Sequence, residues 1–148
     1  MIEKIESPKW AGHLKRILSN VESGIFNEID AEENEDMGED WWYIKDPEGN
    51  ICGLLWISSY TDDLFYRDRG EIAEISFCIQ EESRGKGILS SIIGNIEDLV
   101  KSTYKNATLI LAVSRKTSAY CELVSKTFQK KGYHFSENES SVLLQKEI

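Results

Sequence analysis

A run of glycines and cations in the middle of the chain has the composition of an anion-binding loop. Arg84-Gly85-Lys86-Gly87 follows an apolar stretch at 70–80 and precedes a helical pattern that begins near Ile88. Glycines let consecutive backbone N–H groups turn toward one point, and the positive end of a helix adds to the charge of the two cations. We expect this loop to stabilise a pyrophosphate.

Two common phosphate-binding motifs do not match the loop. A P-loop needs Ser or Thr directly after its Lys so that a hydroxyl reaches the metal, whereas Gly87 follows Lys86 here. The dinucleotide-binding fingerprint needs a third glycine where this chain has Ser90. Both classes are excluded by spacing.

The elements around the loop are predicted to alternate between strands and helices. Ser7 as N-cap and Pro8 as the first helical residue predict an amphipathic helix over 8–21. Strands at 41–45 and 51–57 flank a turn at 46–50, which predicts a hairpin. The later elements are a strand at 107–113 parallel to the strand at 70–80, a helix at 118–131 that ends at Gly132, and strands at 133–135 and 141–145.

The connection at 58–70 carries three aromatic residues, Tyr60, Phe65 and Tyr66. It is more apolar than a solvated loop requires. These side chains either cover an edge of the core or contact a substrate, and the first interpretation is favoured.

Length and composition indicate one domain over 1–148. The chain has 148 residues, of which 41% are hydrophobic and 29% charged, as in ordinary globular proteins. We find no apolar run long enough for a membrane span and no signal peptide, so we expect a cytoplasmic protein without a membrane partner. Cys52, Cys78 and Cys121 are unclustered and lie in apolar segments, which indicates reduced core residues and neither a disulfide nor a zinc site.

The formal net charge of −9 argues against nucleic-acid binding and favours cationic partners. Much of it lies between Glu28 and Asp40, a stretch without a basic residue. This acidic stretch either attracts a cationic partner or is a solvated loop. Trp41 and Trp42 are adjacent, so on a strand one ring faces away from the core. That ring is predicted to stack on such a partner or to form a subunit contact, such as that of a homodimer.

Three segments resemble the GNAT superfamily of acyl-CoA-dependent N-acyltransferases. In its signature, Q/R-x-x-G-x-G/A, Arg84 takes the first position and Gly87 the second, while Leu89 replaces the small third residue. The segment A-E-I-S-F-C at 73–78 resembles the strand that carries the general base in the histone acetyltransferase branch, and F-Q-K-K-G-Y at 128–133 resembles the family's C-terminal Y-E-K-x-G-F element. The resemblance covers the C-terminal half. It implies a mixed α/β fold, with a mostly antiparallel sheet flanked by helices and a parallel, splayed strand pair at the cofactor site.

The same resemblance implies an activity. It is the transfer of an acetyl group from acetyl-CoA to a primary amine of a small molecule or of a protein or peptide, by direct attack in a ternary complex. The residues implied to hold acetyl-CoA are Ile79, Gln80, Arg84, Gly85, Lys86, Gly87, Ile88, Leu89, Ser90 and Phe128.

Glu74 matches the family's catalytic Glu in its local context. Desolvation by its apolar neighbours would make the carboxylate a stronger base, acting through a water. The alternative is an outward-facing Glu paired with a cation on a neighbouring strand. Glu71 is the reserve base, on the opposite face of the strand. The backbone N–H of Ile79 takes the implied role of bonding the thioester carbonyl and later its oxyanion.

The family usually protonates the leaving CoA thiolate with a Tyr, and the matching position here is Phe128, which has no hydroxyl. Tyr120, eight residues earlier on the predicted helix, or Tyr133 can substitute only if local geometry helps. The favoured interpretation of each is a core or rim aromatic. Together with Leu89, Phe128 supports an alternative, a catalytically silent acyl-CoA-binding or protein-interaction module. His13 and His134 lie in unrelated segments, so metal chemistry and a Ser-His-Asp triad are poorly supported.

Overall fold

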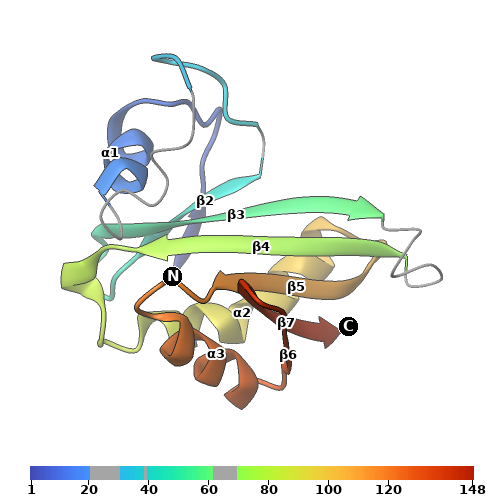
Figure 1. The fold of residues 1–148 in the computed structure, drawn as a ribbon. Coiled ribbons are helices and arrows are strands. Elements are labelled where there is room, and N and C mark those ends of the chain that lie inside the picture. Colours follow the sequence, from blue (N-terminus) through green and yellow to red (C-terminus); the bar gives the residue numbers. More distant parts are fainter. Residues whose placement is uncertain (21–30, 39, 62–69) are drawn as a thin grey trace. The chain divides into compact units, whose positions relative to one another are not determined.

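The computed structural model describes residues 1–20, 31–38, 40–61 and 70–148. Seven strands form one mixed sheet in the order β1-β2-β3-β4-β5-β7-β6 (Figure 1). β4 and β5 are parallel, and the pairs β1–β2, β2–β3, β5–β7 and β6–β7 are antiparallel. The expected mixed, mostly antiparallel sheet is confirmed. The strands are β1 (Ile2–Lys4), β2 (Trp41–Lys45), β3 (Ile51–Thr61), β4 (Glu71–Ile79), β5 (Ala107–Arg115), β6 (His134–Glu137) and β7 (Ser141–Glu147).

The helices of the described residues are α1 (Gly12–Asn20), α2 (Ile88–Thr103) and α3 (Cys121–Lys130), with a short 3-10 helix, η2 (Glu81–Ser83). The chain divides into two compact units. The first comprises Met1–Trp56 and Phe77–Ile88, and the second comprises Ile57–Ser76 and Leu89–Ile148. A single domain over the whole chain stays a prediction. None of the helices in the described ranges is both long and apolar enough to cross a bilayer.

In the first unit, α1 buries one apolar face. Leu14, Ile17 and Leu18 pack in one cluster with Trp41 and Leu54 from the β2–β3 hairpin. The predicted hairpin is confirmed, and its turn is held by Asp46, whose Oδ1 accepts the N–H groups of Glu48 and Asn50 at 2.9 Å each. These backbone bonds also lower the pKa of the Asp46 carboxyl.

The predicted start of the first helix is wrong. Residues 8–10 pair with residues 34–37 instead of starting the helix: the Met37 N–H donates to the Pro8 carbonyl at 2.9 Å, and the Trp10 N–H to that of Glu35 at 2.8 Å. Ser7 and Gly12 have φ of +52° and +55°, outside the helical region. Pairing with a segment distant in sequence therefore overrides the local cap signal. The predicted end at residue 21 lies outside the described residues.

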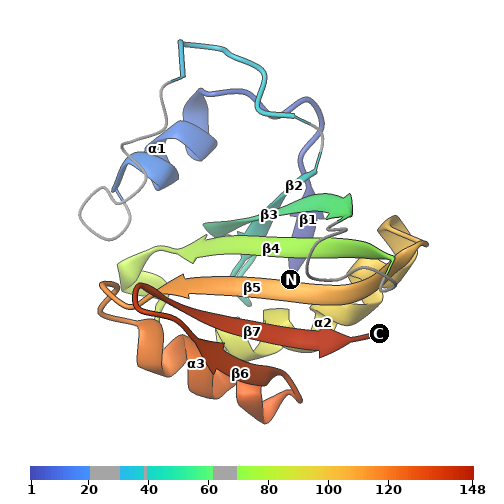
Figure 2. The same cartoon turned by 45° about the vertical axis from the view of Figure 1, so that its right-hand side comes forward.

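In the second unit, β4 and β5 pair in parallel from Ile72↔Leu109 to Ile75↔Ala112, after a register shift between Glu71 and Ile72. The arrows of β4 and β5 point the same way in Figure 2, and β7 runs opposite. Figures 1 and 2 also place α2 and α3 on the same face of β5 and β7. Glu97 of α2 accordingly forms an ion pair at 2.7 Å with Lys146 of β7.

The connection predicted after the hairpin begins later than expected. Residues 58–61 continue β3, so the predicted end of that strand at residue 57 is wrong. Tyr60 packs against the buried cluster of Ile72, Leu109 and Leu111, which supports its interpretation as cover for the core. Phe65 and Tyr66 lie outside the described residues.

Candidate functional site

The strand-to-helix junction predicted around Arg84 is confirmed. β4 ends at Ile79, the η2 turn follows, and α2 begins at Ile88. Gln80 closes the turn: its carbonyl accepts the Ser83 N–H at 3.0 Å, and its own N–H donates to the Cys52 carbonyl on β3 at 2.8 Å. The junction is therefore tied to the neighbouring strand through the backbone.

Two glycines give the loop its conformation. Gly85 and Gly87 have φ of +77° and +76°, where residues with a side chain are strained. Both are exposed, and a Cβ added at either would meet no described atom within 4 Å. Lys86 between them is also exposed. The loop thus offers open backbone and a cation beside the N-terminus of a 16-residue helix, which fits an anionic group.

Arg84 makes a contact that its sequence position does not predict. The side chain is half-buried, and its Nε donates a hydrogen bond of 3.0 Å to the carbonyl oxygen of Ile79. This bond joins the end of the turn to the end of β4. Ile79 is 7% exposed, so its side chain belongs to the interior. Ile88 is buried, while Leu89 and Ser90 in the first turn of α2 are half-buried.

Glu74 lies half-buried on β4 between two fully buried neighbours, Ala73 and Ile75. Its partner across the sheet is Leu111 of β5, so on that side it faces an aliphatic residue and not a cation. Glu71, the reserve base, accepts a hydrogen bond from the Ser59 hydroxyl. Glu74 thus has an aliphatic neighbour on β5, and its role as base stays a prediction.

The helix that carries the predicted general-acid position is shorter than expected. α3 begins at Cys121, so Tyr120 is its N-cap residue and the predicted helical relation between Tyr120 and Phe128 is wrong. The Ser118 hydroxyl oxygen accepts the Tyr120 N–H at 3.2 Å, which forms a turn in place of the first helical residues. The Gly132 φ of +90° confirms the left-handed residue predicted after the helix.

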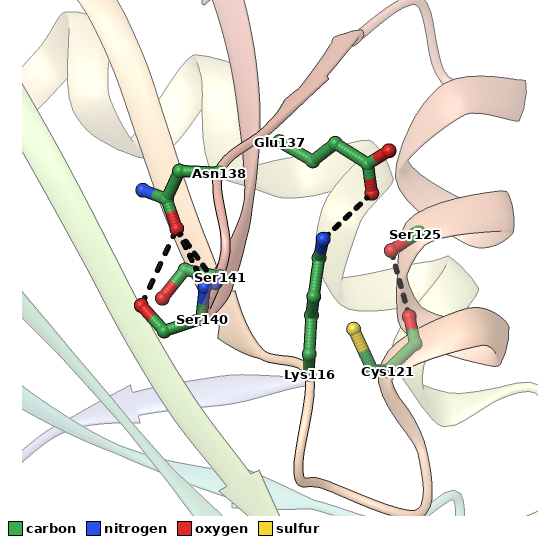
Figure 3. A network of polar contacts seen from close by, with 7 residues as sticks. All are labelled: Lys116, Cys121, Ser125, Glu137, Asn138, Ser140 and Ser141. Atoms are coloured by element: carbon green, nitrogen blue, oxygen red, sulfur yellow. Dashed lines mark hydrogen bonds and ion pairs between the residues drawn. The ribbon is translucent and has the colours of Figure 1, made fainter.

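Figure 3 shows what holds the segment before α3. Lys116 forms an ion pair at 3.1 Å with Glu137 of β6. Its backbone N–H also donates to the Ser140 carbonyl at 2.9 Å. Asn138 Oδ1 accepts the N–H groups of Ser140 and Ser141 at 3.0 and 2.8 Å, which orders the β6–β7 turn. The segment before Tyr120 is therefore anchored to this turn.

Phe128 and Tyr133 lie in the interior. Phe128 is fully buried, so in this structure its ring offers no surface to a ligand. Tyr133 is 5% exposed, and its hydroxyl has no hydrogen-bond partner among the described residues. Burial raises the pKa of the Tyr133 hydroxyl, which makes it a weaker acid. Tyr120, which is half-buried, remains the more accessible of the two predicted substitutes.

The acidic stretch is partly used in local structure. Glu33 pairs with Lys15 of α1, Asp40 with Lys4 of β1 at 3.2 Å, and Asp36 accepts the Gly38 N–H at 2.9 Å. Residues 28–30 and 39 of this stretch lie outside the described residues. Glu32 and Glu35 are exposed, so both interpretations of the stretch stay open.

The outward-facing tryptophan predicted from the adjacent pair is wrong. Trp41 is 7% exposed and stacks on Trp56 with centroids 4.8 Å apart. Trp42 on the other face is 4% exposed, and the Lys4 ammonium lies 4.2 Å from its ring centroid. Both faces of β2 are therefore covered at this point, and neither ring is free to stack on an acceptor or on a second subunit.

Cys52, Cys78 and Cys121 form no disulfide within the described residues. Cys52 and Cys78 are buried as predicted, whereas Cys121 is half-buried at the start of α3. Burial raises the pKa of the Cys52 thiol, which keeps it protonated. Within the ranges that the structure describes, no three His, Cys, Asp or Glu residues gather as metal ligands would.

Gly53 is a further residue near the site that the sequence analysis does not predict. A Cβ built on this residue would lie 2.2 Å from the Cys78 carbonyl oxygen, so only glycine permits this approach of the β3 backbone to β4. An isolated glycine inside a strand pattern, here I-C-G-L-L-W, is the signal that could have indicated it.

Neither models of protein families nor curated proteins match the sequence. Solved structures do match the fold. Over its full length the chain superposes on 88% of a phosphinothricin acetyltransferase of the GNAT superfamily from Sinorhizobium meliloti, solved with acetyl-CoA, with a TM-score of 0.66 and 13% identity. The GNAT domain of S. lividans PAT matches with a TM-score of 0.57 and 15% identity over 73% of this chain and 60% of that chain.

A third match is spermidine N-acetyltransferase from Vibrio cholerae, solved with CoA and spermine. It has a TM-score of 0.52 and 17% identity, and the match covers 72% of this chain and 64% of that one. The chain thus spans less than two thirds of two of these three proteins. Together they establish that it has the fold of the GNAT N-acetyltransferases.

Proposed function

We propose that the protein transfers an acetyl group from acetyl-CoA to a primary amine. The observation that carries this proposal is the loop of Gly85 and Gly87, whose open left-handed backbone and exposed cation lie at the N-terminus of α2 on a GNAT fold. Such a loop favours a pyrophosphate, the group that distinguishes CoA from a simple thioester. Lys86 would add charge on the same side.

The reaction would proceed by direct attack. Glu74 takes a proton from the acceptor ammonium through a water, and the free amine attacks the thioester carbonyl carbon. The Ile79 N–H stabilises the oxyanion of the tetrahedral intermediate. The attacking nitrogen then loses its second proton to solvent. When the intermediate collapses, the C–S bond breaks, its electron pair leaves on sulfur, and the thiolate is protonated by Tyr120 or by solvent. The products are the N-acetylated amine and CoA.

The acceptor is expected to be cationic before it reacts. The chain carries a net charge of −9, which favours approach of amines through the long-range field. A small polyamine-like molecule and a basic protein or peptide both meet this description. Activity on isolated amines would favour the first, and activity only on proteins or peptides the second.

A second candidate function has its own support. Phe128 is fully buried and lacks the hydroxyl of the family's usual acid, and Leu89 stands where a small residue is expected. A catalytically silent acyl-CoA-binding or protein-interaction module on the same fold would need neither a hydroxyl at position 128 nor a small residue at position 89.

Calorimetric titration with acetyl-CoA, followed by pooled amines while thiol release is measured, separates these functions. Binding with acceptor-dependent thiol release supports the transferase. Binding without release from amines, peptides or basic proteins supports the silent acyl-CoA-binding module. No binding of acetyl-CoA contradicts the cofactor assignment and therefore the proposed function.

A further inference from the structure

We propose that Gly53 and the side chain of Arg84 are positioning residues that fix the last two peptide units of β4, and through them the direction of the Ile79 N–H. This inference rests on the proposed function, which assigns that N–H to the thioester carbonyl. Gly53, Cys78, Ile79 and Arg84 all belong to the first compact unit.

The first of these peptide units joins Cys78 to Ile79, and Gly53 lies directly against it. A Cβ on Gly53 would lie 2.2 Å from the Cys78 oxygen, 3.2 Å from the Cys78 carbonyl carbon and 3.2 Å from the Ile79 Cα. All peptide bonds in the described ranges are trans, so the C=O and N–H of one unit point in opposite directions. Because the Cys78 oxygen faces Gly53, the Ile79 N–H points away from β3 at this position.

The second peptide unit joins Ile79 to Gln80 and is held at both ends. Its carbonyl oxygen accepts the Arg84 Nε–H at 3.0 Å, and its N–H donates to the Cys52 carbonyl at 2.8 Å. Cys52 directly precedes Gly53 on β3. Rotation of the second peptide plane would therefore break one of these hydrogen bonds. In the first unit, the missing side chain of Gly53 leaves the room that the Cys78 oxygen occupies.

Fixed peptide planes matter for this chemistry. An N–H that stabilises a developing oxyanion works best when it is already directed at the oxygen, because no reorganisation is then needed during the reaction. Gly53 and Arg84 supply such preorganisation without touching the substrate themselves.

Two substitutions at Arg84 separate positioning from charge. In Arg84→Gln, the amide nitrogen stands the same number of bonds from Cα as the Arg Nε, so it can donate to the Ile79 oxygen without a charge. In Arg84→Lys, the charge is kept but the nitrogen lies one bond further out. Gly53→Ala tests the other contact. Its matched control is Gly94→Ala in α2, where an added Cβ meets only the flexible Lys131 Nζ, at 3.8 Å.

The experiment compares the dissociation constants of acetyl-CoA and CoA, since only acetyl-CoA has the thioester carbonyl. Loss of one well-placed hydrogen bond should lower the preference for acetyl-CoA roughly two- to tenfold. We expect this loss in Gly53→Ala, Arg84→Ala and Arg84→Lys. Arg84→Gln should show a stronger preference for acetyl-CoA over CoA than Arg84→Ala does. If the Arg84 guanidinium contacts the pyrophosphate, both variants will also bind CoA itself more weakly than the wild type.

Amide hydrogen exchange of Gln80 provides a second readout that needs no ligand. The Gln80 N–H should exchange faster in the three variants that lose the preference, and at the wild-type rate in Arg84→Gln and Gly94→Ala. One result would overturn the positioning role of Arg84. Arg84→Lys would show the wild-type Gln80 exchange rate and the wild-type preference for acetyl-CoA over CoA, while both quantities would be altered in Arg84→Gln. A wild-type Gln80 exchange rate together with a wild-type preference for acetyl-CoA in Gly53→Ala would overturn the positioning role of Gly53.

Failure of the proposed function looks different. If the wild-type protein binds neither acetyl-CoA nor CoA, the thioester part of the inference falls together with that function. Gln80 exchange still decides whether Gly53 and Arg84 hold the two peptide units.

Discussion

The rings of Phe128 and Tyr133 meet edge to face, with centroids 4.9 Å apart and planes at 86°. At the position that the sequence resemblance assigns to the family's usual acid, Phe128 places a buried hydrocarbon ring. The Tyr133 hydroxyl is enclosed without a hydrogen-bond partner among the described residues. Neither side chain presents a hydroxyl at the surface. The Tyr133 hydroxyl is costly to bury, because it leaves water and gains no partner there.

Replacing Tyr133 by Phe should leave the protein as stable at neutral pH or more stable by about 1 kcal/mol. The sign above neutral pH follows from the raised pKa: the folded protein keeps the Tyr133 proton to higher pH than the unfolded chain, which ionises near pH 10. Wild-type stability should therefore fall more steeply than that of the variant as the pH rises above about 10. Urea unfolding at several pH values measures this, and equal alkaline slopes would contradict it.

Glu74→Gln should lower kcat about a hundredfold or more, because the amide cannot accept the ammonium proton. The acetyl-CoA dissociation constant should change little, because the side chain is not assigned to the cofactor. Glu122→Gln, an exposed carboxylate paired with Lys126 on α3, is the matched control and should keep wild-type turnover. Steady-state kinetics with calorimetry measures both quantities. Unchanged kcat in Glu74→Gln would remove it as the base.

Lys86→Ala should weaken acetyl-CoA binding roughly tenfold at low salt, because a charge-assisted contact with phosphate is lost. The difference from wild type should shrink as salt is added, since the loop is exposed and its field is screened. Lys126→Ala, also exposed but on α3, controls for loss of one positive charge. Calorimetric titrations of the wild type and both variants with acetyl-CoA, at a low and a high salt concentration, measure these differences. If both variants bind alike, Lys86 does not contact the phosphates.

Leu89→Ala should tighten acetyl-CoA binding a few-fold, because a small residue at the third signature position gives the phosphates more room near the loop. Leu123→Ala, an exposed leucine on α3, is the matched control. Because Leu89 is half-buried, thermal unfolding of both variants should accompany the titrations, so that lost packing is not mistaken for a changed site. Weaker binding in a fully folded Leu89→Ala would show that the leucine itself supports the cofactor.

Local sequence predicted several elements closely. The apolar run that became β4, the glycine loop, the start of α2 and the parallel β5 all agree with the structure, because periodicity and turn residues act over a few positions. The start of α1 and the length of β3 were missed. Backbone pairing with residues 34–37 decided the first, and continuation into a strand that packs Tyr60 on the core decided the second.

The sequence by itself determined where a glycine loop must form between β4 and α2, since Gly85 and Gly87 adopt backbone angles that other residues avoid whatever surrounds them. Only the tertiary structure decided what the loop's neighbours do. The approach of Gly53 to Cys78, the bond from Arg84 to Ile79, and the burial of Trp42 and Phe128 each join parts of the chain through contacts in space. Such contacts depend on how strands and helices pack. The sequence pattern of one segment does not indicate which other segment packs against it.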